Sequence, residues 1–507
     1  MSKTKRILQN GLLLSAVAIL MRTVSVAFNA YLKGKLGDGG MGLISLTMSV
    51  YGFAVTFATS GIALAVTRLV AEAIGRREEE DASAAMRAAV KYALFFGALA
   101  GAALFFASDA ISLYLLKDVR TRPSLRLLAF SLPPIALSAA LSGYFVAVRR
   151  VHHNAATQLC EQGVRIFITV TALAAFLPRG LEYACIAVVG GSSLAELFSF
   201  FLLFFQYLHD RRRHLPYKKG GRPNALRRLC SVALPTAGAA WCRSGLITAE
   251  HLLIPICLAM GTFSREEALA SYATVHGMAL PIVLWPTAIL SSFAGLLVPE
   301  VAESAAACRP REVLSATEKA LAGTVLFSCA AAAVLAGTAE SLGHLVYRSA
   351  DVGKYIRILA PLIPVMYLDS AVDAILKGLG KQVYCMAVNI LDAASAVLLV
   401  RLLLPTMGAE GYLLVIVITE MLNFLFSAGR LVSLVKVRKR TWLFCAACPI
   451  LAMGAWAASA VLLQAPASAL ETVLYAVTTL LLYLLPMGIL LLLRRKKKKP
   501  SLLQEGS

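Results

Sequence analysis

Apolar runs follow one another along almost the whole chain, from Ile7 to Leu493. A run of about twenty such residues crosses the hydrocarbon core of a bilayer as an α-helix. The pattern therefore predicts an all-α integral membrane protein with about 14 transmembrane helices. The predicted spans are centred in residues 7–30, 41–71, 88–107, 125–148, 156–177, 183–208, 229–258, 268–298, 314–346, 355–377, 382–404, 411–435, 442–464 and 471–493.

Segments of the first half of the chain reappear in the second half about 230 residues later. Residues 69–90, "LVAEAIGRREEEDASAAMRAAV", align with residues 297–321, and residues 133–150 align with residues 361–381. A period of six helices returns the chain to the same side of the membrane, so the two copies are predicted to be parallel repeats. Two such lobes around a central cavity are typical of an alternating-access transporter.

These repeats define the expected domains. We expect an N-terminal six-helix lobe at 1–208, a basic cytoplasmic linker at 209–228, a C-terminal six-helix lobe at 229–440, two appended helices at 441–494 and a basic cytoplasmic tail at 495–507.

Composition and charge agree with a membrane protein. Of the 507 residues, 59% are hydrophobic and 15% are charged, a balance that a soluble protein of this size cannot solvate. The net charge of +21 is concentrated in short loops and in the tail "RRKKKK", so it indicates topology and anionic lipid rather than nucleic acid. With the more basic loops inside, both termini are predicted to be cytoplasmic.

The sequence does not indicate a signal peptide, a disulfide framework, a metal site or a catalytic domain. The first apolar run is too long for a cleavable signal peptide and is expected to remain as helix 1. Ten cysteines are scattered through the predicted helices, so neither a disulfide framework nor a metal site is expected. The pair Cys445 and Cys448 forms the only C-x-x-C motif. We interpret both cysteines as small apolar side chains that pack between helices. No loop is long enough for a catalytic domain.

Two arginines inside predicted spans are the main candidates for substrate binding. Arg22 lies in "AILMRTVSVAF" and Arg243 in "AAWCRSGLITAEHLL", each in the first helix of its half. A cation at this depth costs several kcal/mol unless it faces a polar cavity or a partner. Because a guanidinium binds phosphate well, the pair predicts a cationic cavity. The alternative to cavity lining for each arginine is a structural ion pair, or a side chain that extends to the membrane interface. Arg68 is a third candidate for substrate binding, and its alternative is an anchor at the membrane interface.

Acidic residues inside the predicted spans are candidates for ion coupling. Glu161 and Arg165 are four residues apart and favour a structural pair over a coupling site. Asp369 and Asp373 share a helix face, which makes them candidates for H+ or Na+ coupling, although Lys377 can pair with Asp373. Weaker candidates are Glu196, Glu250, Asp392 and Glu420.

Glycine and proline mark the candidate hinges within the predicted spans. These are Gly61, Pro235, Pro281 and Pro286, with a further breaker at Pro299. A tolerated kink without a moving role is the alternative for each residue.

The N-terminal segment resembles a known family. The stretch Arg22–Leu43, with "F-x-x-Y-L-x-x-x-L-G-x-x-G-M-G-L", and residues 49–76 are similar to the stage V sporulation protein B branch of the polysaccharide flippases. That branch belongs, with the lipid II flippases, to the multidrug/oligosaccharidyl-lipid/polysaccharide exporter superfamily. The resemblance implies a non-enzymatic flippase without a cofactor that carries undecaprenyl-pyrophosphate-linked sugars across the bacterial plasma membrane, here for spore cortex peptidoglycan or another polysaccharide.

The resemblance also implies roles for particular residues. Arg22 matches the helix 1 arginine of the lipid II flippases. Arg243 corresponds to an arginine of their second lobe only in its approximate position along the chain. Their helix 2 arginine pair has no counterpart here, and Gly42-Leu43 replaces their acidic residue after helix 1. Membrane potential, H+ or Na+ would drive the cycle, and cell-wall synthesis proteins would be partners.

Three alternatives to a flippase follow from the same observations. A cation-coupled multidrug exporter of the same superfamily would need an acidic cavity and usually has twelve helices. A membrane-embedded glycosyltransferase or ligase would need a soluble catalytic region or a large external loop. A scaffold in a cell-wall complex would have no reason to keep two arginines in its spans.

Overall fold

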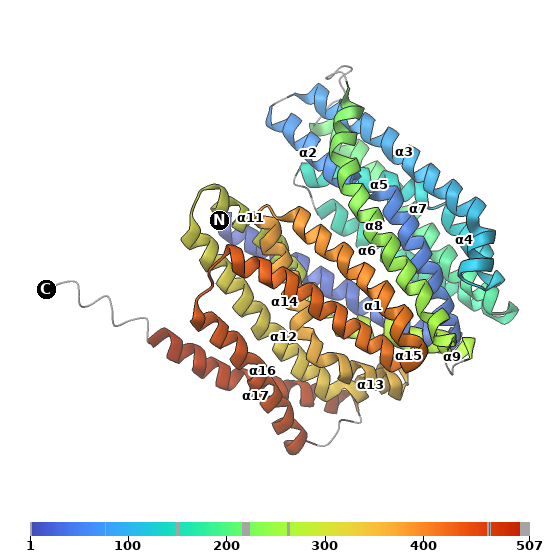
Figure 1. Cartoon of the computed structure of the whole chain (residues 1–507). Coiled ribbons are helices and arrows are strands. Elements are labelled where there is room, and N and C mark those ends of the chain that lie inside the picture. Colours follow the sequence, from blue (N-terminus) through green and yellow to red (C-terminus); the bar gives the residue numbers. More distant parts are fainter. Residues whose placement is uncertain are drawn as a thin grey trace. The chain divides into compact units, whose positions relative to one another are not determined.

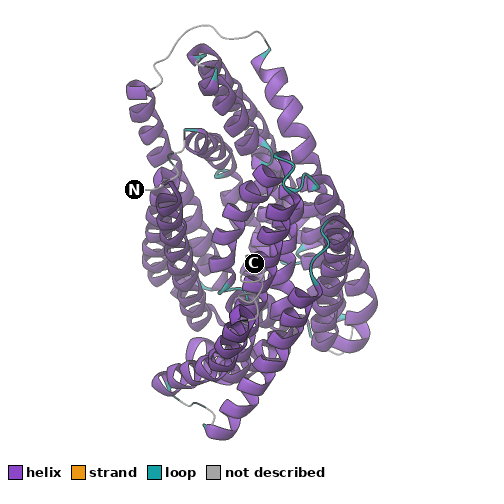
Figure 2. Ribbon diagram, turned by 90° about the vertical axis from the view of Figure 1, so that its left-hand side faces the viewer, coloured by secondary structure: helices purple, strands orange, loops and turns teal. Residues whose placement is uncertain are grey.

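Helices account for every regular element in the part of the chain that the structure describes. This computed structural model describes residues 3–76, 78–148, 150, 152–214, 224–260, 264–463, 466 and 468–496. Figure 2 shows the helices and the short turns between them. The predicted all-α fold is thus confirmed. Residues 215–223 of the predicted linker and residues 497–507 of the predicted tail lie outside the described residues.

The first half of the chain, blue to green in Figure 1, contains eight helices. They are α1 (Lys3–Thr59), α2 (Ile62–Gly75), α3 (Glu79–Ala110), α4 (Arg122–Ala129), α5 (Leu132–Ala147), α6 (His152–Phe176), α7 (Leu181–His214) and α8 (Ala225–Ala259).

The second half, green to red in Figure 1, contains nine helices in the described ranges. They are α9 (Arg265–Tyr272), α10 (Leu280–Val283), α11 (Thr287–Ala306), α12 (Pro310–Tyr347), α13 (Ala350–Leu359), α14 (Ile363–Gly378), α15 (Gln382–Leu434), α16 (Lys439–Leu462) and α17 (Ala469–Lys496). A π-helical segment, Ala273–Ala279, joins α9 to α10.

Ten helices in the described residues are long and apolar enough to cross a membrane, or 11 if the bent pair α4 and α5 counts as one span. This supports a multi-pass membrane protein, whereas the predicted count of 14 is not confirmed. Two of the ten are much longer than a bilayer, because α1 has 57 residues and α15 has 53, or about 80–85 Å at 1.5 Å per residue. Each therefore has the length for more than one crossing.

Those two helices change direction at glycines. Gly37 in α1 has φ 71° and Gly408 in α15 has φ 60°. Positive φ is favourable mainly for glycine, so each glycine allows two helical segments to meet at a kink with non-helical backbone. The hydrophobic pattern placed both glycines between two predicted spans, which agrees with these kinks.

Three predicted spans are broken. The span at 125–148 is divided between α4 and α5, which meet at 44°. The span at 268–298 consists of α9, the π-helical segment, α10 and α11, and the span at 355–377 consists of α13 and α14. Proline lies at each break, since it lacks the N–H that a continuing helix needs. Pro133, Pro281, Pro286 and Pro361 are these prolines.

Contacts divide the chain into two compact units. The first unit contains Met1–Gly34, Ser271–Asp392 and Glu410–Ser507, and the second contains Lys35–Ala270 and Ala393–Ala409. Helix α8 belongs to the second unit because it packs against α2 and α3. This division differs from the expected boundary at the linker, so the two lobes with their predicted limits remain a prediction.

The first unit contains two apolar cores. One joins α11, α12, α14 and α15 around Val301, Ile375 and Leu431. The other joins α12 to the two last helices, α16 and α17, around Cys329 and Cys448. Cys448 is fully buried there, as expected for a small apolar side chain that packs between helices.

A close approach between α2 and α8 holds the second unit together. Gly61, at the N-terminus of α2, has φ 77°. A Cβ atom at this position would overlap the backbone of Ala233, two residues before Pro235 in α8. Two of the predicted hinge positions are thus brought together, although their movement is untested.

We predict that Gly61→Ala destabilises the protein. The left-handed backbone alone costs an L-residue about 1–2 kcal/mol, and the overlap with Ala233 adds to this cost. Thermal unfolding of the detergent-purified protein should occur at a lower temperature than for the wild type. Gly52→Ala is the matched control, because Gly52 is helical and nothing lies within 4 Å of an added Cβ. Equal melting temperatures of both variants would contradict the prediction.

Candidate functional site

Arg22 binds a backbone carbonyl at a helix break in the first unit. Its Nη1 atom donates to the carbonyl oxygen of Leu284 at 2.5 Å. Leu284 follows α10, and the same oxygen accepts from the backbone N–H and the hydroxyl of Thr287 at 3.1 and 2.6 Å. Cations are favourable at a helix C-terminus, where carbonyls lack intrahelical partners. The guanidinium therefore caps the end of α10.

Two further side chains bind the same break. Tyr367, a fully buried residue of α14, donates its hydroxyl to the carbonyl oxygen of Val283 at 2.8 Å. The indole Nε1–H of Trp285 donates to the hydroxyl of Thr23 at 3.0 Å. Backbone groups at a break inside a membrane must find such partners. The break thus has a defined geometry set by α1 and α14.

An apolar cavity of about 640 Å³ lies beside this break. Trp285 and Thr23 belong to its wall, so the residues next to Arg22 and Leu284 border the cavity. Helices α1, α12 and α17 provide the other walls, and those side chains are mostly aliphatic. The lining includes Val26, Ala27, Ala30, Val334, Leu335, Leu342, Leu345, Val346, Val473 and Ala476. A cation and an apolar cavity are thus neighbours within the first unit.

The other two candidate arginines lie in the second unit. Arg243, on α8, is exposed. Arg68, on α2, pairs with Glu72 at 3.0 Å and is 64% exposed. Arg228 lies 3.5 Å from Glu72, which makes Arg68 part of an ionic cluster at the ends of α2 and α8. That setting favours the structural alternative for Arg68. A cavity shared by Arg22 and Arg243 remains a prediction.

The acidic candidates each have a partner. Glu161 and Arg165 form an ion pair of 2.6 Å on α6 with exposed side-chain fractions of 22% and 29%, which supports the structural interpretation. In α14, Asp373 accepts from Lys377 at 3.1 Å, the alternative that the sequence left open. Asp369 instead accepts from Asn423 of α15 at 3.3 Å. The two aspartates therefore differ in their surroundings.

The proline hinges occupy different helical positions. Pro235 lies inside the continuous helix α8. Pro281 lies in the first turn of α10, and Pro286 precedes α11 directly. Only the last two are next to the break that binds Arg22. Pro299 is within α11.

One partly buried carboxylate, that of Glu196, has a network that the sequence did not reveal. Tyr51 of α1 donates to Glu196 of α7 at 2.5 Å, and its hydroxyl lies 2.5 Å from that of Ser131. Ser131 precedes α5, so three helices meet at one polar cluster in the second unit. Glu196 was a weak candidate because its partners lie far away in the chain. Its position within an apolar run was the only signal.

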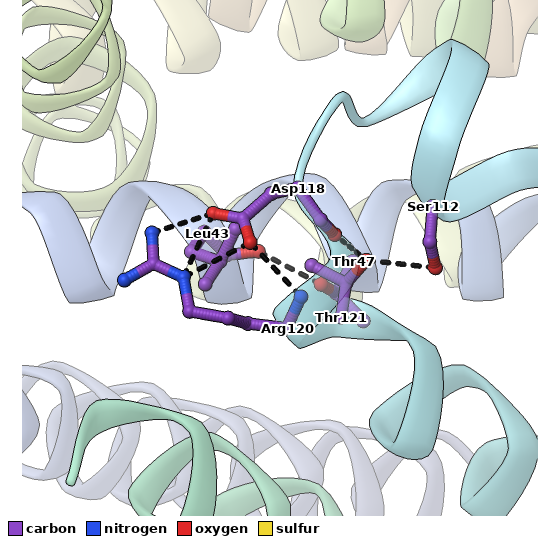
Figure 3. A network of polar contacts seen from close by, with 6 residues as sticks. All are labelled: Leu43, Thr47, Ser112, Asp118, Arg120 and Thr121. Carbon is purple, nitrogen blue, oxygen red and sulfur yellow. Dashed lines mark hydrogen bonds and ion pairs between the residues drawn. The ribbon is translucent and has the colours of Figure 1, made fainter.

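A second polar network closes the turn between α3 and α4 (Figure 3). Asp118 accepts from the backbone N–H of Arg120 at 3.0 Å and from its guanidinium. The hydroxyl of Thr121 donates to Ser112 at 3.0 Å, and both residues are 1% exposed. Because each polar group bonds within the turn, this network has a structural role.

Two solved membrane proteins are similar to this chain in fold. Lipid II flippase MurJ in an inward closed conformation matches with a TM-score of 0.73 and 12% identity over 94% of this chain and 98% of that chain. A multidrug resistance MATE family transporter of the MOP superfamily, in an inward-facing conformation, matches with a TM-score of 0.65 and 14% identity over 83% and 99%. Both structures thus share the helical fold of this chain over most of its length.

Comparisons of sequence relate this chain to known proteins. Residues 7–238 match the family of polysaccharide biosynthesis proteins. Over 429 residues, the chain is 25% identical to stage V sporulation protein B of Bacillus subtilis (strain 168), with 83% of each chain covered. The protein is therefore a relative of that sporulation protein, as its N-terminal motifs indicated.

We predict that Glu161 stabilises the fold through Arg165. Glu161→Gln should lower the free energy of unfolding, because it leaves a cation unpaired inside a helix bundle. The loss should be smaller than the about 3–5 kcal/mol typical of fully buried pairs, since both side chains are partly exposed. The double variant Glu161→Gln/Arg165→Gln should recover most of the thermal stability. If Glu161→Gln instead melted like the wild type but lost an ion-dependent transport rate, Glu161 would be a coupling residue.

Proposed function

We propose that the protein is an alternating-access flippase that moves undecaprenyl-pyrophosphate-linked sugars from the inner to the outer leaflet. The substrate is a peptidoglycan precursor such as lipid II, used for spore cortex, or another polysaccharide precursor. The observation that carries this proposal is the apolar cavity bordered by Thr23 and Trp285, beside the guanidinium of Arg22.

This arrangement fits an amphiphilic anion. A pyrophosphate offers several oxygens to the planar fork of donors on arginine. A polyprenyl chain needs an apolar surface that excludes water, and the aliphatic walls from α1, α12 and α17 supply one. The cation and the cavity therefore select for a lipid that carries phosphate next to a long hydrocarbon.

The Arg22 contact supports a mechanism by exchange of partners. Without substrate, the guanidinium binds the neutral carbonyl of Leu284. A phosphate oxygen is a stronger acceptor, since a hydrogen bond between two charged groups is about twice as strong as a neutral one. Substrate binding would thus release the end of α10 and change the geometry between Pro281 and Pro286, which leads to the outward-open state.

Relatives support this substrate class over drug export. MurJ is a lipid II flippase by name, and stage V sporulation protein B covers most of this chain. The MATE match covers less of the chain than the MurJ match does. A cation-coupled multidrug exporter would also need an acidic cavity, whereas Arg22 places a positive charge beside this one.

Orientation and energy source complete the proposal. Both termini face the cytoplasm of the bacterial plasma membrane, with cell-wall synthesis proteins as partners. Membrane potential acts on a cationic site at about 2.3 kcal/mol per charge per 100 mV. Asp369, hydrogen-bonded to Asn423, is the stronger candidate for H+ or Na+ coupling, because Lys377 already neutralises Asp373.

We predict that Arg22 is required for flipping. Translocation can be measured in proteoliposomes that contain a fluorescent undecaprenyl-pyrophosphate-linked sugar. A quencher added outside reaches only the label in the outer leaflet, so the quenched fraction reports how much substrate has crossed. Arg22→Ala should reduce the rate by about 10- to 100-fold, as expected for one lost charged hydrogen bond. Arg22→Lys should retain part of the rate, and Arg243→Ala should also lose activity.

Arg227→Ala is the matched control for this experiment. Arg227 is an exposed arginine near the start of α8, and its removal should leave flipping unchanged. Wild-type rates in Arg22→Ala, with equal amounts of folded protein, would rule out the proposed site. Failure of Arg22→Ala and Arg22→Lys to fold would instead assign Arg22 a structural role.

We also predict that filling the apolar cavity blocks long-chain substrates. Ala476→Trp places a large side chain in the wall from α17. It should slow flipping of the undecaprenyl substrate more than that of an analogue with a short prenyl chain. The control is Ala457→Trp, at an exposed position of α16 that does not line the cavity. Equal slowing of both substrates would show that the cavity does not hold the hydrocarbon chain.

A further inference from the structure

A second cavity in the first unit lies where three membrane-spanning helices end. Its volume is about 540 Å³, and it is bordered by the start of α12, the end of α14 and the end of α15. Its walls are apolar and include Val313, Leu314, Leu379, Leu434 and Val435. Three basic residues, Arg309, Lys381 and Lys436, complete the lining. This basic cavity shares no residue with the apolar cavity beside Arg22.

Two of the three cations have no acidic partner within the described ranges of the chain. Arg309 donates to Glu312 at 3.3 Å, and both side chains are more than half exposed. Among the described residues, no ion pair involves Lys381 or Lys436. The N-terminus of the 38-residue helix α12, with Pro310 in its first turn, also faces this cavity and adds partial positive charge. The lining of the site thus has a surplus of positive charge.

Two of the three cations, Lys381 and Arg309, lie on hydrogen-bonded turns. Lys381 donates its backbone N–H to Leu376 at 2.9 Å in a turn that Gly380 closes with φ 74°. Arg309 donates its backbone N–H to Ser304 at 3.0 Å.

Lys436 lies in a segment anchored by Arg438. The backbone N–H and Nε of Arg438 donate to Glu318 of α12 at 3.0 and 2.9 Å. This carboxylate raises the pKa of Arg438, so the pair stays charged. The backbone that carries the basic rim is therefore held by hydrogen bonds around the cavity.

We propose that this basic cavity binds an anionic phospholipid, with the phosphate between Lys381, Lys436 and Arg309 and an acyl chain against the apolar wall. Helices end where the lipid headgroups lie, and a basic pocket at that level attracts anionic lipid. A soluble anion would use the rim but not the wall formed by Val313, Leu379 and Val435. The lipid would join the ends of α12, α14 and α15 and would act as a bound component distinct from the transported substrate.

Native mass spectrometry of the detergent-solubilised full chain tests this site. Phosphatidylglycerol should remain bound to the wild type, and phosphatidylcholine with the same acyl chains should not. Lys381→Gln/Lys436→Gln should weaken phosphatidylglycerol binding by about tenfold or more, because each cation contributes to the attraction. Lys319→Gln/Lys439→Gln removes the same charge from exposed positions outside the cavity and should retain binding. Equal weakening in both double variants, or equal binding of both lipids, would overturn the proposal.

A second readout uses the wild type alone and does not depend on folding of a variant. Cys308 is exposed and lines the basic cavity. Phosphatidylglycerol should slow its reaction with a water-soluble maleimide, whereas phosphatidylcholine with the same acyl chains should leave the rate unchanged. Protection of Cys308 by glycerol phosphate at the same concentration would assign the cavity to a soluble anion instead, and no protection by phosphatidylglycerol would reject the lipid site. Loss of flipping by Arg22→Ala would leave this result unaffected.

Discussion

The contact between Arg22 and the helix break after α10 fixes how α1 meets the broken span in the first unit. The guanidinium donates to the carbonyl oxygen of Leu284, which also accepts from the N–H and the hydroxyl of Thr287. Three donors thus meet at one carbonyl, so the backbone of the break is well satisfied in a medium of low polarity. The same contact gives the cation an acceptor within a predicted span, where a charge without a partner is costly. The hydroxyl of Tyr367 also stabilises the break, because it donates to the neighbouring carbonyl of Val283.

This interaction also sets the chemistry of the proposed site. A carbonyl is a modest partner for a guanidinium, so the contact is strong enough to hold the break yet weak enough for phosphate to replace it. The aliphatic cavity beside Trp285 adds a surface for hydrocarbon. Charge and apolar surface are thus adjacent without the charge being buried in the apolar wall, which is the arrangement that an amphiphile requires.

Sequence reasoning was most successful where the signal is local. Hydrophobic runs predicted the helices, and a spacing of four residues predicted both Glu161 with Arg165 and the option of Asp373 with Lys377. The partners of Arg22 and Glu196 are not local, because Leu284 and Tyr51 lie 262 and 145 residues away in the chain. Pro281 and Pro286 lie at a break, whereas Pro235 and Pro299 lie within continuous helices. Gly37 and Gly408 lie between predicted spans, and the structure has a kink at each of them.

The division into two units has a mechanical consequence. Every point at which the chain changes unit lies inside a helix: once in α1 after Gly34, once in α9 after Ala270, and twice in α15, after Asp392 and after Ala409. Gly37 and Gly408 lie within three residues of two of these points, and both have positive φ. An L-residue at either kink would strain the backbone that joins the two units, so two of the four connections depend on a single hydrogen atom in place of a side chain.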